Sequence, residues 1–90
     1  MAASKDVLIK QLEKVIPGIV FFDHDEFGIS AEEGTEVEGM PLADYYDGAY
    51  WDPNEHYMVM GIHRKVRFAV SKCGWRCEWI NPGMIGLYQD

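Results

Sequence analysis

Apolar residues recur at helical spacing in two stretches of the chain. The first stretch covers residues 7–16, with polar residues on its opposite side. Ser4 is a suitable N-cap for this stretch, and Pro17-Gly18 is typical of a helix end. The second stretch predicts a helix over residues 62–73, followed by Gly74, because glycine readily takes the positive φ found after a helix. Two helices are therefore expected, one in each half of the chain.

Four short apolar runs predict strands that form two hairpins. The runs are rich in β-branched and aromatic residues, and the third alternates between apolar and polar positions. The predicted strands are residues 19–22, 27–31, 75–80 and 84–88. The polar residues 23–26 would turn the first hairpin, and Asn81-Pro82-Gly83 has the residue types of a tight turn in the second.

The turn at Pro82-Gly83 sets an expected register for the second hairpin. If these two residues form the whole loop, Trp79 faces Gly86 and Cys77 faces Tyr88. An indole over a glycine is a favourable cross-strand pair. Trp79 and Cys77 lie on the same face of their strand, and this face is expected to be buried.

The stretch between the two halves is the least regular part of the sequence. Glycine and proline interrupt residues 32–52, and no single period persists there. The motif Asp52-Pro53-Asn54-Glu55 suits either a helix start or a turn, and residues 57–60 suit an extended segment. We predict a turn at 52–55 and a strand at 57–60, with a helix as the alternative.

The elements follow the order helix, strand, strand, loop, strand, helix, strand, strand. This order predicts a single α+β domain over residues 1–90, built from two layers. One layer is an antiparallel or mixed sheet of four to five strands, and both helices lie on one face of it. A chain of 90 residues, 48% of them hydrophobic, suffices for one core and is too short for two.

Charge is distributed unevenly along the chain. The net charge is −7, yet no lysine or arginine occurs between Lys14 and Arg64, where eleven acidic residues lie. From Arg64 to Glu78 the balance is reversed, with five basic residues against one acidic residue. The overall negative field repels phosphate, so direct binding of nucleic acid is not expected. The eleven acids, which define the acidic segment, are Asp23, Asp25, Glu26, Glu32, Glu33, Glu36, Glu38, Asp44, Asp47, Asp52 and Glu55.

The sequence predicts a cytoplasmic protein that does not bind a membrane. No apolar run approaches the ~18 residues of a membrane-spanning helix, and residues 1–6 lack the apolar core of a signal peptide. Cys73 and Cys77 have neither the spacing of a Cys-x-x-Cys motif nor the number needed for a disulfide framework. A reducing compartment accommodates both thiols.

Residues 44–52 combine aromatic and acidic side chains at high density, and we name them the acidic–aromatic segment. Tyrosine and tryptophan supply contact area at little entropic cost, and aspartates beside them attract a basic partner, so one interpretation is a protein-binding site. The other interpretation is structural: the aromatic rings cap the core, or the acids pair with the basic residues 64–67. The candidate partner-binding residues are Asp44, Tyr45, Tyr46, Asp47, Tyr50, Trp51 and Asp52.

Motifs for metal binding and catalysis are incomplete. Asp23 and Asp25 resemble the first ligands of an EF-hand loop, but Phe27 and Gly34 stand at its fifth and twelfth positions. The three histidines and two cysteines lack the close spacing of a structural zinc site. We therefore predict no catalytic residue, no metal ligand and no cofactor. A metal-assisted hydrolase or cation-binding domain that uses Asp23, Asp25 and a histidine is the alternative.

These observations favour a non-enzymatic module that binds a protein. The acidic segment can imitate the row of phosphates in a nucleic acid, so the expected partner has a basic, nucleic-acid-binding surface and the expected effect is inhibition. In size, charge and aromatic content the chain resembles phage-encoded inhibitors of host defence or transcription. A structural or self-associating protein is a further alternative, and the sequence is compatible with a monomer or a homodimer.

Overall fold

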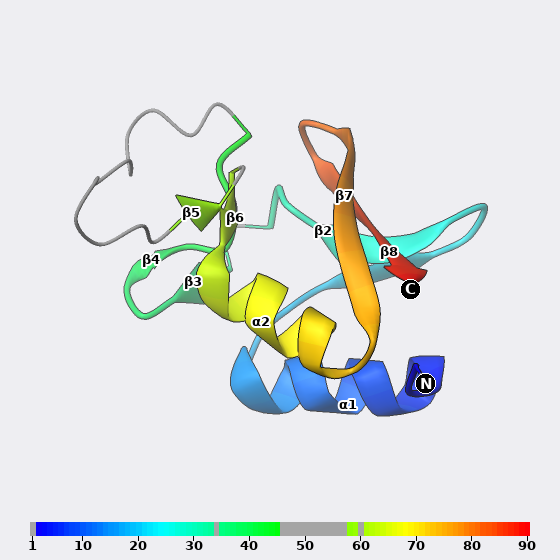
Figure 1. Cartoon of the computed structure of the whole chain (residues 1–90). Coiled ribbons are helices and arrows are strands. Elements are labelled where there is room, and N and C mark those ends of the chain that lie inside the picture. The colour runs from blue at the N-terminus through cyan, green and yellow to red at the C-terminus, as the bar shows by residue number, and fades with distance from the viewer. Residues whose placement is uncertain (1, 34, 46–57, 60) are drawn as a thin grey trace.

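The computed structural model describes residues 2–33, 35–45, 58–59 and 61–90. They form two layers, a four-stranded antiparallel sheet and two helices that cover one of its faces (Figure 1). The helices are α1 (Lys5–Val15) and α2 (Arg64–Lys72). The sheet contains, in spatial order, β1 (Phe21–Asp23), β2 (Phe27–Ser30), β8 (Met84–Gln89) and β7 (Trp75–Asn81). The predicted α+β class is confirmed.

Two smaller hairpins lie outside this sheet. In the first, β3 (Glu36–Val37) pairs with β4 (Met40–Pro41), and in the second, β5 (Met58–Val59) pairs with β6 (Ile62–His63). β5 falls within the strand predicted at 57–60, but its described pairing is with β6 and not with the four-stranded sheet. The turn predicted at 52–55 lies outside the described residues.

The start of α1 and the ends of both helices follow the predictions. The hydroxyl of Ser4 caps α1 by accepting a hydrogen bond from the N–H of Val7 at 3.3 Å. Gly74 follows α2 with a φ of 78°. Neither α1 nor α2 is long and apolar enough to cross a membrane, and no other described segment forms an α-helix.

α2 begins at Arg64, two residues later than predicted. Ile62 and His63 belong to β6, where the backbone N–H of His63 donates to the carbonyl of Leu42 at 2.9 Å. The ring of His63 then caps the helix, because its Nδ1 accepts a hydrogen bond from the N–H of Lys65 at 3.1 Å. Ile62 fits the apolar spacing of the helix although it is extended and buried, so spacing alone places the boundary too early.

The hairpin of β7 and β8 has a different register from the predicted one. Trp79 pairs with Ile85 and not with Gly86. The shift arises at Ile80, an extra residue in β7 that forms a β-bulge before the turn, and the other predicted pair is displaced in the same way. A bulge strengthens the local right-handed twist, which a plain Pro-Gly loop matches poorly.

Two glycines of the sheet lie beneath aromatic rings on the face opposite the helices. Gly28 pairs with Phe22, and a Cβ on Gly28 would lie 2.6 Å from Cζ of that phenylalanine. A Cβ on Gly86 would lie 2.7 Å from ring carbons of Tyr88. The aromatic cover of a glycine that was predicted for Trp79 is thus provided by two other residues.

The core lies between the sheet and the helices. The indole N–H of Trp75 donates to the carbonyl of Ala3 at 2.8 Å, and Phe27 packs edge-on against the same indole with 5.8 Å between centroids. Trp75 and Cys77 are both buried, so the predicted inward face of β7 is confirmed. The largest fully buried side chains are Leu8, Leu12, Ile16, Ile29, Ile62, Ile85, His63, Val66 and Val70.

Candidate protein-binding surface

The structure describes the beginning of the acidic–aromatic segment. Of the candidate partner-binding residues, Asp44 and Tyr45 are described, and Asp44 is half-buried whereas Tyr45 is 46% exposed. The other candidates lie outside the described residues, and their role stays a prediction. They are Tyr46, Asp47, Tyr50, Trp51 and Asp52.

Backbone hydrogen bonds hold the entry to this segment against β6. Ala43 forms a β-bridge with Ile62, and the N–H of Asp44 donates to the carbonyl of Gly61 at 2.7 Å. Gly61 has a φ of 79°, and a Cβ at this position would lie 2.5 Å from the backbone oxygen of Asp44. The close approach of the two backbones therefore requires glycine at position 61.

Tyr45 rests on the four-stranded sheet through Trp79. The two rings meet edge to face, with 5.1 Å between centroids and an interplanar angle of 84°. Trp79 is partly buried on β7, and a Cβ on Gly61 would lie 3.3 Å from its ring. One side of Tyr45 therefore packs against the protein, as the structural interpretation expects, and the other side faces solvent.

Sequence reasoning did not identify Trp79 and Gly61 as parts of this surface. The alternating pattern of β7 placed Trp79 on the buried face, which the structure shows in part, but the pattern contains no information about its contact with Tyr45. The only local signal for Gly61 is its residue type, because a glycine after an apolar run marks a tight turn or a close backbone approach.

The two layers of the fold differ in charge. The helices carry seven of the eight basic residues and only two of the fifteen acidic ones, so the helical layer is net positive in a protein with a net charge of −7. The other acids of the described residues lie on the sheet, the small hairpins and the loops. The helical layer is therefore the basic part of the described structure, and the rest, which carries most of the described acids, is called its acidic side below.

Between described residues, two recorded ion pairs link the acidic segment to the helices. Lys5 binds Asp23 at 3.1 Å, and Lys65 binds Glu38 at 2.7 Å, which lowers the pKa of the Glu38 carboxyl mainly through the hydrogen bond from Lys65. The ion pair of Lys65 with Glu38 is one contact of the kind that the structural interpretation expects between the acidic segment and residues 64–67. The exposed acids of this segment that form no ion pair with a described residue are Asp25, Glu26, Glu32, Glu33 and Glu36.

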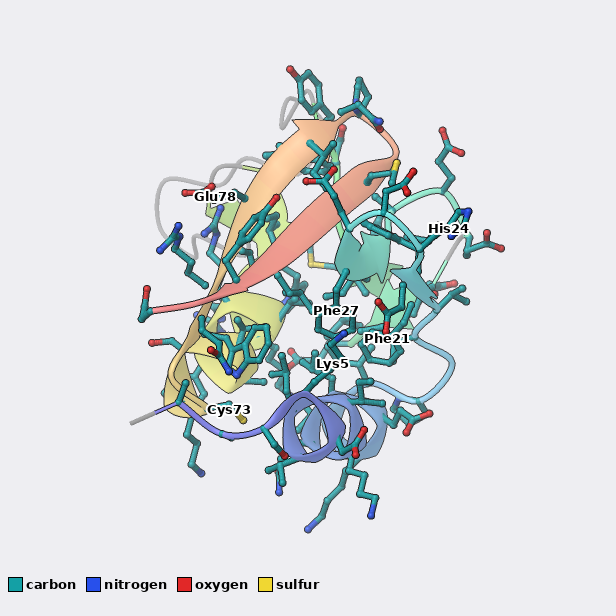
Figure 2. The ribbon with its side chains drawn as sticks, turned by 90° about the vertical axis from the view of Figure 1, so that its right-hand side faces the viewer. Lys5, Phe21, His24, Phe27, Cys73 and Glu78 are labelled. Carbon is teal, nitrogen blue, oxygen red and sulfur yellow. The ribbon has the colours of Figure 1, made fainter. Side chains whose placement is uncertain are left out.

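At the first hairpin, where the alternative metal site would lie, the carboxylate of Asp23 is paired with a lysine. Lys5 reaches from α1 to bind Asp23 and lies 4.8 Å from the centroid of Phe27, beside Phe21 (Figure 2). No group of three His, Cys, Asp or Glu side chains within the described residues is arranged to hold a metal ion. His24 is exposed at the tip of this hairpin. No observation in the described part of the chain therefore favours the cation-binding alternative.

His63 and the two cysteines lie in or against the core. His63 is buried, and its burial lowers the pKa of the imidazole, with a smaller contribution in the same direction from Arg64 and Lys65. Burial raises the pKa of the Cys77 thiol to about 11, which keeps the thiol protonated near neutral pH. Cys73 is half-buried and is not in a disulfide.

Within the described residues, the surface that combines exposed aromatic area with acidic charge is therefore the one around Asp44, Tyr45 and Trp79. Its function is inferred from these residues and their surroundings. Comparisons with protein-family models, with curated proteins and with solved structures found no match for this chain.

Proposed function

We propose that this protein is a binding module, not an enzyme, and that its acidic side occupies a basic surface of a partner protein and inhibits it. The observation that carries this proposal is the exposed ring of Tyr45, braced by Trp79 and adjacent to Asp44. A braced aromatic ring loses little entropy on binding, and the exposed carboxylates of the acidic segment can pair with arginine or lysine of the partner.

The charge of the acidic segment supports a nucleic-acid-binding protein as the partner. Its eleven acids have no basic residue among them, and five of the described ones are exposed and form no ion pair with a described residue. Such a surface offers a basic groove the same field as a run of phosphates, so it competes with nucleic acid for that groove. Small acidic inhibitors encoded by phages have the same combination of size and charge.

The first experiment is affinity capture at low ionic strength from a lysate of the cells in which the protein occurs, with mass spectrometry of the captured proteins. The Tyr45→Ala variant should lose the partner, because it removes the braced ring. Val20→Ala is the control, because Val20 is an exposed apolar residue, 38% exposed, that lies outside the proposed surface. Equal capture by wild type and Tyr45→Ala would contradict the proposed surface.

The second experiment measures affinity for the captured partner as a function of salt. An electrostatic mimic should lose affinity by roughly a hundredfold or more between about 50 and 200 mM salt. Binding releases counterions from the charged surfaces, and this release becomes less favourable as the salt concentration rises. Duplex DNA or RNA should displace the protein from its partner. A partner whose affinity is independent of salt would contradict the mimicry, even if the Tyr45→Ala result supports the surface.

A further inference from the structure

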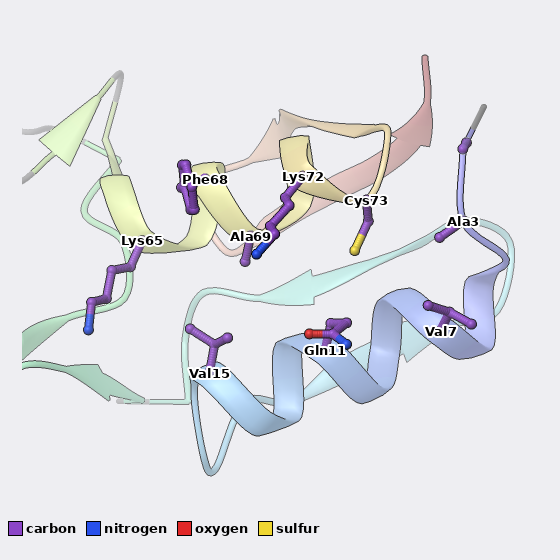
Figure 3. A pocket seen from close by; sticks show the side chains of 10 residues that line it. Ala3, Val7, Gln11, Val15, Lys65, Phe68, Ala69, Lys72 and Cys73 are labelled. Carbon is purple, nitrogen blue, oxygen red and sulfur yellow. The ribbon is translucent and has the colours of Figure 1, made fainter.

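An apolar groove runs between the two helices. It has a volume of about 590 Å³, and Figure 3 shows the side chains that line it. The helices are antiparallel, since Ala3, before α1, donates a backbone hydrogen bond to Cys73, after α2, at 2.7 Å. The groove therefore follows both helix axes and is open to solvent. Its apolar lining includes Val7, Val15, Phe68, Ala69 and Cys73.

The walls of the groove are unusually exposed for apolar side chains. Phe68 is 71% exposed, Val7 is 47% exposed and Val15 is 41% exposed. They are three of the five large hydrophobic side chains that are exposed in the described part of the chain. Apart from Gln11, the two N-terminal alanines and two lysines, the described lining is formed by apolar residues of the helices and Cys73. Clustered apolar exposure of this kind is typical of a binding surface.

The sides of the groove carry positive charge. Lys65 and Lys72 line it from α2, and Lys72 forms no ion pair with a described residue, whereas Lys65 binds Glu38. On α1, Lys14 lies two turns beyond Val7 and hence on the same side of the helix. By the same periodicity, the two acids of α1, at positions 6 and 13, point to the opposite side.

We propose that this groove binds an acidic amphipathic helix of another protein. Phe68 lies between Lys65 and Lys72 on one stripe of α2, and the seven residues from the first lysine to the second span two turns, about 10 Å. A helix laid along the groove would place its apolar stripe on Val7, Val15 and Phe68 and acidic residues two turns apart beside the lysines. An amphiphile with a single anionic head group would contact only one of the two lysines.

This site is independent of the proposed function. The acidic side of the protein is expected to bind a basic surface, whereas the groove lies on the helical layer, where basic residues outnumber acidic ones by seven to two. Charge complementarity therefore assigns opposite kinds of partner to the two sides. Either site can fail its test without affecting the result for the other.

The test uses a synthetic amphipathic peptide of about sixteen residues, with leucine at helical spacing and glutamate on both flanks. We expect the full-length protein to bind the fluorescein-labelled peptide with a Kd of roughly 10 μM or below. A second peptide with the same leucines and lysine in place of glutamate should bind at least about tenfold more weakly, because the groove is flanked by lysines. Amide chemical-shift changes caused by the first peptide should map to Val7, Val15, Phe68 and Cys73.

Matched variants distinguish specific binding in the groove from nonspecific binding of the peptide elsewhere on the protein. Phe68→Ala should weaken binding of the glutamate peptide by roughly tenfold, because a central aromatic anchor is removed. Val15→Ala should also weaken it, whereas Val20→Ala should not, and the two valines are similarly exposed, at 41% and 38%. Lys72→Glu should weaken binding, and Tyr45→Ala should leave it unchanged. All of these side chains are exposed or half-exposed, and thermal melting confirms that each variant is folded.

Several results would overturn the proposal. Equal affinity for the glutamate and lysine peptides would remove its electrostatic basis. If the glutamate peptide shows no saturable binding, a helix is not the occupant of the groove. If dodecanoate alone changes the amide chemical shifts of the same residues, the occupant is a small amphiphile. Concentration-dependent sedimentation that Phe68→Ala abolishes would instead identify a second copy of this chain as the occupant.

Discussion

The ring of Tyr45 meets the indole of Trp79 edge to face, with 5.1 Å between the ring centroids. Edge-to-face aromatic pairs contribute roughly 1 kcal/mol beyond the area that they bury. A double-mutant cycle of Tyr45→Ala and Trp79→Ala should therefore give a coupling free energy of about 1 kcal/mol in urea unfolding. The control cycle pairs Tyr45→Ala with Phe68→Ala and should give none. A coupling indistinguishable from zero in the first cycle would mean that Trp79 does not brace Tyr45.

Gly61 should tolerate alanine much less well than Gly39. Both glycines have a φ of 79°, but a Cβ on Gly61 would lie 2.5 Å from the backbone oxygen of Asp44, whereas nothing lies within 4 Å of a Cβ on Gly39. Gly39→Ala should cost about 1 kcal/mol of stability, the strain of the backbone conformation alone. Gly61→Ala should cost about 3 kcal/mol, because the backbone at Asp44 must also move. Equal losses in denaturant unfolding would contradict this close approach.

Stability should fall on mild acidification because of His63. Burial, and to a smaller extent Arg64 and Lys65, lower the pKa of His63 below its ordinary 6.5, although Glu38 opposes the shift. As the pH falls below 6.5, His63 takes up a proton in the unfolded chain but not yet in the folded chain, and this uptake stabilises the unfolded state. The contribution of neutral His63 to the free energy of unfolding is therefore fully present above pH 6.5. It is lost as the pH falls from 6.5 towards the pKa of His63 in the folded protein.

The free energy of unfolding, measured in urea at about pH 7.5 and about pH 5.5, tests this effect. The slope from one histidine is at most about 1.4 kcal/mol per pH unit. His63→Asn retains a side-chain oxygen that can cap α2 but does not titrate, so it should show a smaller loss between the two pH values than the wild type. If the loss is the same in both proteins, the wild-type pH dependence comes from other groups.

The two thiols should differ in reactivity. Burial raises the pKa of Cys77 to about 11, and the folded protein shields its sulfur, whereas Cys73 is half-buried beside the groove. Iodoacetamide at neutral pH should modify Cys73 first, and Cys77 at least about a hundredfold more slowly. In the Cys73→Ser variant, where Cys77 is the remaining thiol, mass spectrometry should detect modification mainly after unfolding. Rapid modification of that variant in its native state would contradict the buried position.

Local signals were sufficient for much of the fold. Ser4 caps α1, Gly74 follows α2, and the alternation in residues 75–79 marks the inward face of β7, as the sequence predicts. Capping, helical periodicity and strand alternation all act within a few residues, which is why a single sequence reveals them. The first two residues of the candidate surface, Asp44 and Tyr45, were also recognisable from composition.

Contacts between distant positions were not recognisable in this way. The bulge at Ile80 moved the register of β7 by one residue, and His63 ended a strand and capped a helix where apolar spacing predicted helix throughout. Tyr45 and Trp79 are far apart in the sequence, and no local pattern around either residue predicts their contact.

The sequence by itself determined the number and type of the main elements, the α+β class and the presence of an acidic segment followed by a basic one. The tertiary structure alone decided that an apolar groove lies between the two helices, that two lysines of α2 line it, and that Tyr45 rests on the sheet. The reason is physical: local patterns select a backbone conformation residue by residue, whereas surfaces are made when elements remote in sequence pack against one another to bury a common core.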